Sequence, residues 1–308
     1  MNATKMRTSR MADTSRTLNA YFTYLNKRRE AEGPKPTALG TSGRGSMAGS
    51  CSRQIGLQML DVPESDPIDS KTLLAFHIGT ALHEMTQEAM EDVYKMRSEA
   101  PVDLQPLGFP LSGNIDGIYT DPENRNKHIV WELKSKTSFG FKLARRSGQP
   151  EKHEVAQAAM YALGKIGTQG HRIDVTSIHL TYLCKDTSYG RDATMMGQTL
   201  EWLIGLDEPV PGQDGMTPRQ IGLAEANRIK AIDAEVNDGF VPERFVPEHG
   251  LVDNVPMPDS KQQPWRCRYC RYNSLCATLP TDQTPIKETV VQLLLEERET
   301  SVGFTETS

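Results

Sequence analysis

Residues 113–136, GNIDGIYTDPENRNKHIVWELKSK, contain two apolar runs on either side of a polar segment. The first run carries Asp116, and the second carries Glu132 and Lys134. Because Gly, Pro, Asn and Asp favour turns, the segment DPENRN at 121–126 predicts the turn of a β-hairpin. The sequence therefore predicts two paired strands that hold charged side chains in their middle.

The expected strand pairing brings the two acids together. A turn centred near Asn124 gives an antiparallel register in which Asp116 lies opposite Glu132. Glu132 and Lys134 are two residues apart in one strand, so their side chains share a face. Two such carboxylates repel each other, and burial adds a desolvation cost, unless a divalent cation neutralises them. Carboxylate oxygens are the ligands that Mg²⁺ and Mn²⁺ prefer. A solvated strand with a Glu–Lys pair, or a register shifted by a bulge, fits these residues as well.

Composition describes an ordinary globular protein. The chain has 308 residues, of which 37% are hydrophobic and 24% charged, which suits one large domain or two small ones. The sequence has no apolar stretch of roughly 20 residues and no apolar signal region, so we expect a cytoplasmic protein without a membrane partner. A net charge of −5 restricts nucleic-acid binding to local basic segments. Five cysteines without a secretion signal favour metal or cluster ligation over disulfides.

Apolar periodicity predicts the main helices. A long helix should begin with Asp69 or Ser70 as its N-cap and end near Tyr94. Its expected buried side consists of Leu73, Leu74, Ile78, Leu82, Met85, Ala89 and Val93. Further helices are predicted at 151–165 and 217–237, and a strand is predicted at 175–184.

Several short motifs follow one another around the hairpin. In chain order they are HIGTALHE (77–84) with His83, then Asp116, then Glu132-Leu133-Lys134, then a helix with Gln157 and Tyr161 one turn apart. This set resembles the PD-(D/E)XK nuclease superfamily, with Ile115-Asp116 in place of the leading PD pair. The histidine motif and the QxxxY helix resemble its RecB-like branch in particular.

Four cysteines bracket these motifs. Cys51 lies in CSR, and Cys267, Cys270 and Cys276 lie in WRCRYCRYNSLC. An early cysteine with a late C-x2-C-x5-C resembles the iron–sulphur RecB-like nucleases. Among these, the closest match is to the stand-alone CRISPR-associated exonucleases and their viral relatives. The resemblance implies one structural [4Fe–4S] cluster, although four cysteines also satisfy a tetrahedral zinc site. The fifth cysteine, Cys184, falls on a predicted strand and is expected to be a core thiol.

The resemblance also implies a catalytic metal, Mg²⁺ or Mn²⁺, with ligands from three side chains and one carbonyl group. These ligands are His83, Asp116, Glu132 and the Leu133 carbonyl oxygen. For His83, an ordinary helix histidine bonded to the backbone or to Gln87 remains an alternative.

Three further residues complete the implied catalytic set. Lys134 would orient the attacking water and offset charge on the phosphorane oxygens. Gln157 would fix the surroundings of the metal or touch a phosphate, and Tyr161 would pack against the sugar–phosphate strand. A simple amphipathic border remains an alternative for Gln157 and Tyr161.

The segment after the second strand is basic. From Lys134 to Lys152 there are six Lys or Arg residues against one acid. Its middle, SFGFKLARRSGQP, reads as a loop-like link. Lys142, Arg145 and Arg146 in this link are predicted to bind the phosphates of DNA, because counterion release favours such contacts.

Together these features predict an α/β nuclease fold, a central mixed sheet flanked by helices, closed by a C-terminal cysteine segment. Residues 1–50 are expected to form a helix and a Gly/Ser/Pro linker, 51–276 the nuclease core, and 277–308 a loosely ordered tail. The predicted function is a metal-dependent exonuclease that acts on single-stranded or frayed DNA. One alternative is a DNA-processing subunit that acts in complex with other proteins or with copies of itself. The other is a zinc-containing DNA-binding protein without catalysis.

Overall fold

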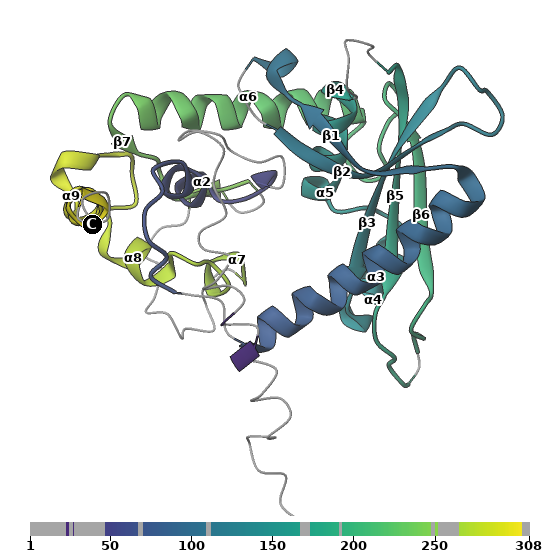
Figure 1. Cartoon of the computed structure of the whole chain (residues 1–308), viewed down its shortest axis with the longest axis horizontal. Helices are drawn as coiled ribbons and strands as arrows, with labels where there is room; N and C mark the ends of the chain where they lie inside the picture. Colours follow the sequence, from purple (N-terminus) through teal and green to yellow (C-terminus); the bar gives the residue numbers. More distant parts are fainter. Residues whose placement is uncertain are drawn as a thin grey trace, which may run out of the picture.

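The protein folds into two lobes joined by one long helix (Figure 1). The structure is a computed structural model that describes residues 23–24, 27, 47–66, 70–108, 112–166, 173–190, 193–247, 250–251 and 265–303. The joining helix is α6 (Pro218–Asn237), which contacts elements of both lobes. The larger lobe contains the main sheet, and the smaller lobe contains the cysteines of the C-terminal segment.

A six-stranded mixed sheet forms the larger lobe, in the order β4-β1-β2-β3-β5-β6. The bounds are β1 (Arg97–Asp103), β2 (Ser112–Thr120), β3 (His128–Lys136), β4 (Lys165–Ile166), β5 (Val175–Cys184) and β6 (Thr199–Gly205). The pair β3–β5 is parallel and every other pair is antiparallel. Helices α5 (Lys152–Leu163) and α6 cover one face, and α3 (Ser70–Tyr94) crosses the other (Figure 1). The predicted α/β architecture is confirmed.

The hairpin has the predicted register. Gly117 pairs with Trp131 and Ile118 with Val130, so the next step along the ladder sets Asp116 opposite Glu132. Alternate residues of β3 then face opposite sides of the sheet. Trp131 packs toward α3, whereas Val130 packs toward α5. Glu132 and Lys134 share the face of Val130, which is the more deeply covered face.

Helix α3 has the predicted bounds, but its predicted buried side is wrong. Ile78, Met85 and Val93 are exposed, whereas Gln87 is buried and Leu82 packs into the cluster on that face of the sheet. The reason is that α3 turns toward the sheet a strip that includes polar side chains. Periodicity of apolar residues cannot find a strip of this kind.

The basic segment is a helix rather than a loop. Helix α4 (Ser138–Ser147) begins after the N-cap Thr137, whose hydroxyl oxygen accepts a hydrogen bond from the Gly140 N–H. It ends at Gly148, whose positive φ of 66° suits glycine. Phe141 and Ala144 are its only buried residues. Two buried positions in ten, with a glycine inside, leave little helical signal in the sequence.

The smaller lobe has its own core. It contains α2 (Ser52–Met59), α7 (Trp265–Arg268), α8 (Asn273–Thr278), α9 (Val290–Gly303) and the short strands β7 (Phe240–Val241), β8 (Phe245–Val246), β9 (Gly250–Leu251) and β10 (Thr284–Pro285). Two 3-10 turns complete the described elements, η2 (Gln105–Leu107) in the larger lobe and η3 (Ile286–Glu288) in the smaller one. The core residues are Leu57, Val62, Val241, Tyr272, Leu275, Leu279, Ile286 and Val291.

The C-terminal segment can be compared with its prediction, whereas most of the N-terminal segment cannot. Residues 277–303 are more ordered than the predicted loose tail, because Ile286 and Val291 are buried in the smaller core. The predicted N-terminal helix and linker lie largely outside the described residues. None of the described helices combines the length and apolar character that crossing a bilayer requires.

Candidate functional site

Two carboxylates from neighbouring strands form the centre of the site. Glu132 is buried, with 1% of its surface exposed, and the Asp116 side chain is 17% exposed. The Leu133 N–H donates to Asp116 Oδ2 over 2.7 Å, so this carboxylate is fixed to the neighbouring strand. Burial, reinforced by the charge of Asp116, raises the pKa of Glu132 to about 7.

Lys134 pairs with the buried acid. Its Nζ lies 2.7 Å from Glu132 Oε1 and donates to Gln157 Oε1 over 3.1 Å. Although burial alone would lower the pKa of Lys134, the charge of Glu132 and its neighbours raises it, so Lys134 stays protonated. The other carboxylate oxygen, Glu132 Oε2, is buried and has no hydrogen-bond partner among the described residues. A cation would satisfy this oxygen.

The predicted histidine also reaches this site. His83 Nδ1 lies 3.4 Å from Asp116 Oδ2. Burial opposes the charged imidazole, but the hydrogen bond and the charge of Asp116 outweigh it and raise the pKa of His83. His83, Asp116 and Glu132 thus approach one another from α3, β2 and β3.

Sequence reasoning missed two residues beside Asp116. Gln87, one turn after His83, donates from Nε2 to the Asp116 carbonyl oxygen (2.9 Å) and to Glu99 Oε1 (3.0 Å). Glu99 lies in β1, at the position opposite Asp116 of β2. Its backbone φ of 47° is in the left-handed region. The signal for Gln87 in the sequence was its i, i+4 spacing from His83. That spacing suggested a hydrogen bond between these two side chains rather than contacts with Asp116 and Glu99.

Helix α5 places the other two predicted residues under the site. Gln157 is half-buried and binds Lys134. Tyr161 is only 3% exposed, and its ring packs so closely on Gly113 that a Cβ there would lie 2.8 Å from it. Burial, together with the nearby charge of Glu132, raises the pKa of Tyr161. This burial favours a supporting position for Tyr161 beneath the carboxylates.

A second polar cluster lies near the first. Glu151, His153 and Glu154 form the one group of three possible ligand side chains, within the described part of the chain, whose ligand atoms all lie within 4.8 Å of one another. The predicted set of His83, Asp116 and Glu132 is therefore more widely spaced.

The ammonium group of Lys136 already forms ion pairs with the second cluster. Lys136 Nζ lies 2.6 Å from Glu151 Oε1 and 2.8 Å from Glu154 Oε1. Its positive charge holds the pKa of Glu154 below the usual range, even though burial acts in the opposite direction. Sequence reasoning gave His153 no role. The available signal was Lys136, two residues after Lys134 and on the same face.

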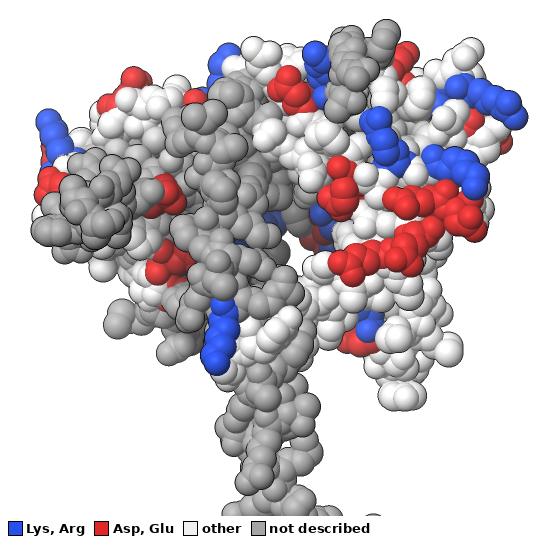
Figure 2. All heavy atoms as spheres, in the orientation of Figure 1, with Lys and Arg blue, Asp and Glu red and all other residues white. Residues whose placement is uncertain are grey.

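The predicted DNA-binding residues lie on α4, which directly follows β3, the strand that carries Glu132 and Lys134. Lys142 is half-buried, and Arg145 and Arg146 are exposed. By contrast, acids gather over α3 on the face shown in Figure 2. The exposed acids of this helix are Glu84, Glu88, Glu91 and Asp92. Phosphate groups would be attracted to α4 and repelled from the outer surface of α3.

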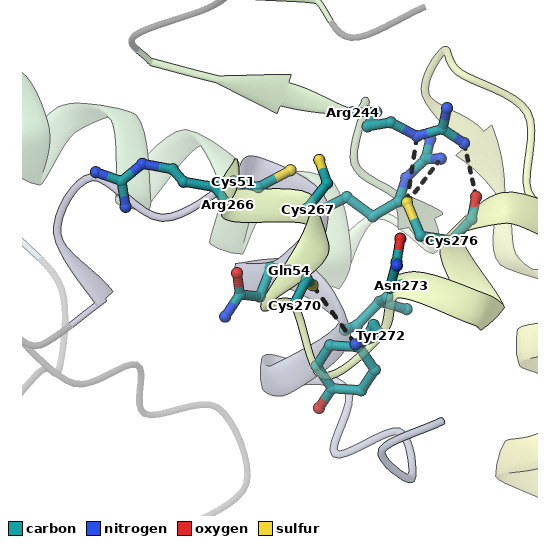
Figure 3. Close-up of a pocket in the computed structure, with 11 residues that line it drawn as sticks. Cys51, Gln54, Arg244, Arg266, Cys267, Cys270, Tyr272, Asn273 and Cys276 are labelled. Atoms are coloured by element: carbon teal, nitrogen blue, oxygen red, sulfur yellow. Dashed lines mark hydrogen bonds between the residues drawn. The ribbon is translucent and has the colours of Figure 1, made fainter. Parts of the chain in front are cut away.

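The four bracketing cysteines line one cavity in the smaller lobe. Cys51 precedes α2, Cys267 lies in α7, Cys270 follows it, and Cys276 lies in α8. The structure thus brings together residues from both ends of the nuclease core (Figure 3). All five cysteines are free thiols, and Cys184 packs in the core of the larger lobe, as predicted.

These thiols are in an environment that disfavours their charge unless a partner is present. Burial, with smaller contributions from the other cysteines, raises the pKa of Cys267 to about 11 and that of Cys270 to about 12. Burial also raises the pKa of Cys51. Metal ligands must be thiolates, so a bound cation would supply the missing compensation. The donor set therefore fits a four-thiolate metal centre.

Comparisons with known proteins assign the chain to a family. A solved structure titled "Crystal structure of SSO0001" is similar to this chain with 14% identity and a TM-score of 0.46, over 86% of this chain and 98% of that one. No curated protein sequence matches. The sequence profile of the PD-(D/E)XK nuclease superfamily matches residues 58–277, which include Asp116, Glu132 and Lys134. Its members are typically nucleases that depend on divalent metals such as Mg²⁺ or Mn²⁺. With its mixed sheet, its paired carboxylates and this match over most of its length, the chain belongs to the PD-(D/E)XK nuclease superfamily.

Proposed function

We propose that this protein is a metal-dependent exonuclease that cleaves single-stranded or frayed DNA. The observation that carries the proposal is the buried Glu132, which has one oxygen without a partner and lies beside Asp116 and Lys134. A carboxylate pair this costly to bury is explained if the site serves a cation and a reaction. The motifs around it favour the RecB-like branch and a likeness to CRISPR-associated exonucleases.

The residues of the site would divide the chemistry among them. His83, Asp116 and Glu132, with the Leu133 carbonyl oxygen, would hold Mg²⁺ or Mn²⁺. Such a metal polarises the scissile phosphate and lowers the pKa of a bound water. Lys134 would orient the attacking water and balance charge on the phosphate oxygens. Gln157, which already binds Lys134 Nζ, would hold that ammonium group in place. The buried Tyr161 would pack beneath the carboxylates and support them.

Helix α4 supports a single-stranded substrate. Phe139 is 71% exposed and Leu143, one turn later, is also exposed on the same helix face. Lys142 and Arg146 lie beside them along the helix, so aromatic, apolar and cationic groups alternate there. Bases of a single strand can stack on an exposed ring while neighbouring cations bind the phosphates. Helix α4 directly follows β3, which carries Glu132. Single-stranded DNA bound along α4 would therefore lead toward Glu132.

The direct test compares wild type with Glu132→Gln on end-labelled DNA. Wild type should degrade linear single-stranded DNA with Mn²⁺ or Mg²⁺ but not with EDTA, and the variant should be inactive. Circular single-stranded DNA should resist, because an exonuclease needs an end. Cleavage of circles would indicate an endonuclease, and equal activity of the variant would exclude the carboxylate site.

The four cysteines support a structural [4Fe–4S] cluster as the second cofactor. In a tetrahedral zinc site the Zn–S bonds of about 2.3 Å bring every pair of sulfur atoms to within about 4 Å. A four-iron cluster likewise takes four thiolates, one on each iron. The resemblance of the cysteine pattern to the iron–sulphur RecB-like nucleases favours iron over zinc.

Two alternatives have distinct outcomes. A subunit that acts only in complex would bind DNA alone but cleave only when its protein partners are added. A zinc-containing DNA-binding protein would be colourless, contain one zinc per chain and show no metal-dependent cleavage. The intact set of Asp116, Glu132 and Lys134 disfavours the second alternative, because DNA binding alone does not need these residues.

A further inference from the structure

Two arginines are buried against the cysteine cavity. Arg53 is 1% exposed and Arg244 is 3% exposed. Arg244 Nε donates to Cys276 Sγ over 3.2 Å, and Arg53 Nη1 donates to the same sulfur over 4.0 Å. Both guanidinium groups therefore converge on one cysteine, and the dashed lines from Arg244 to Cys276 can be followed in Figure 3.

Further hydrogen bonds fix the two side chains to the backbone. Arg53 donates to the carbonyl oxygens of Pro242 (2.9 Å), Thr281 (3.0 Å) and Asp282 (3.0 Å). Arg244 Nη2 donates to the carbonyl oxygens of Cys276 (2.6 Å) and Leu279 (3.2 Å). These contacts hold the guanidinium groups in one orientation, so the N–H groups that face Cys276 are preorganised.

Placing two cations side by side in a buried position is unfavourable. The guanidinium groups of Arg53 and Arg244 both lie at the Cys276 sulfur, so their positive charges repel each other there. Both arginines contact the Cys276 sulfur, which can carry a negative charge when it is a thiolate and then offsets this repulsion.

We infer that Arg53 and Arg244 are positioning residues that bind an anionic four-thiolate metal centre through Cys276. This rests on the cofactor in the proposed function. Four thiolates carry four negative charges, and either one Zn²⁺ or an oxidised four-iron core offsets two of them. The two guanidinium groups are opposite in sign to the two negative charges that remain, so the centre and the arginines attract each other.

The inference has two physical consequences. An N–H donor on a metal-bound sulfur stabilises its thiolate form, so the metal is held more tightly. If the centre is an iron–sulphur cluster, its reduced state carries one more negative charge, and the arginines favour that state. They therefore raise the reduction potential, because hydrogen bonds to the sulfurs and net charge set it.

The test compares Arg244→Gln and Arg244→Lys with Arg266→Gln. Arg266 lines the same cavity, but its guanidinium group points away from the sulfurs, so it is the matched control (Figure 3). Metal loss to a chelator and the reduction potential are measured on anaerobically purified full-length protein. Arg244→Gln should lose metal at least tenfold faster and disfavour the reduced cluster about tenfold, a shift of about 59 mV for one electron. Arg244→Lys keeps the positive charge, so its rate of metal loss and its reduction potential should lie between those of wild type and Arg244→Gln.

Each outcome decides the inference. If both Arg244 variants match wild type in metal loss and potential, or if Arg266→Gln changes as much as they do, the inference is wrong. Arg244→Lys supplies the answer if Arg244→Gln does not fold. A wild type with one zinc per chain would overturn the iron cluster alone, and the inference would then be decided by the rate of zinc loss. A wild type with neither metal overturns both.

Discussion

At the scale of single residues, two lysines on one face of β3 have different surroundings. Lys134 contacts Glu132 and Gln157, whereas Lys136 contacts Glu151 and Glu154 and lies 4.4 Å from the centre of the Tyr182 ring. Both are ion-paired, so their charges alone do not separate their roles. Both partner carboxylates, Glu132 and Glu154, have one buried oxygen without a partner among the described residues. The difference is that the partner of Lys134 lies beside Asp116, on the strand whose Leu133 N–H holds that second carboxylate.

We therefore expect opposite effects from two alanine substitutions. Lys134→Ala should lose cleavage by at least a hundredfold while Mn²⁺ still stabilises the protein, because the ligands remain. Lys136→Ala should retain cleavage per folded molecule but lose about 3–5 kcal/mol of stability, because the buried Glu154 loses its counterion. Single-turnover cleavage and chemical unfolding measure the two effects. Unchanged turnover in Lys134→Ala would exclude its catalytic role.

The sequence predicted the carboxylates but not their supports. Asp116 and Glu132 could be paired because a hairpin with a defined turn fixes the register, and the structure has this register. Gln87 and Glu99 could not be found in this way. Their contacts depend on how α3 crosses the sheet, and no local pattern encodes that crossing.

At the scale of elements, α4 offers a test of the substrate path. Replacing Arg145 and Arg146 by Ala should weaken DNA binding equally for all sequences and reduce the salt slope by about 2, because phosphate contacts carry no base information. The matched control replaces Arg125 and Lys127, which are exposed in the β2–β3 turn at the opposite end of β3. Fluorescence anisotropy across salt concentrations measures both. Equal slopes for the two double variants would place α4 off the DNA path.

His179, on the face of the sheet that α3 covers, predicts that the stability of the protein depends on pH. On β5, His179 Nδ1 contacts the Tyr119 hydroxyl at 2.9 Å and Nε2 contacts Glu201 Oε2 at 3.2 Å. Burial lowers the pKa of His179, and the partial opposition of Glu201 does not reverse this. The unfolded chain then binds a proton more readily than the folded one. Stability should fall as pH drops from about 6.5, the unfolded value, through the lower folded value.

Removing the imidazole should weaken that dependence. We expect His179→Gln to lose less stability than wild type between pH 7.5 and pH 5, measured as the free energy of unfolding in denaturant. Because other histidines titrate in both proteins, the difference between the two curves isolates His179. Parallel curves would contradict the assignment.

Predictability differed between the helices for a physical reason. The bounds of α3 follow from local sequence, but the side that it buries depends on the polar contacts that its His83 and Gln87 make with Asp116 of β2. Helix α4 was missed because a short helix with two buried residues is stabilised by packing more than by propensity.

At the scale of the whole molecule, the smaller lobe depends on contacts between distant parts of the chain. The Arg53 side chain donates to Pro242, Thr281 and Asp282, and Gly49 N donates to Glu225 Oε1 of α6. The sequence indicated only that cysteines from both ends meet. The core that α2 and α9 share could not be predicted, because single-sequence patterns do not encode which distant apolar residues pair.

The cysteines should hold this lobe together. Cys51 lies in front of α2, and its three partners lie in the C-terminal segment, so ligation closes a very long loop. Loop-closure entropy grows with loop length, so the centre should contribute on the order of several kcal/mol to stability. This contribution acts within the smaller lobe, between segments that are far apart in the sequence. It leaves the carboxylate site in the larger lobe chemically intact.

Two cysteine variants separate this effect from ordinary packing. Cys51→Ala should lose the metal centre and several kcal/mol of stability together, on the order expected for opening that loop. Cys184→Ala, equally a buried thiol but in the larger core, should keep the metal and lose about 1 kcal/mol from a small cavity. Iron, sulphide and zinc analysis with thermal unfolding measures both. If Cys51→Ala retained full metal content, Cys51 would not be a ligand. If it lost the metal without any loss of stability, the centre would not connect the two ends of the chain.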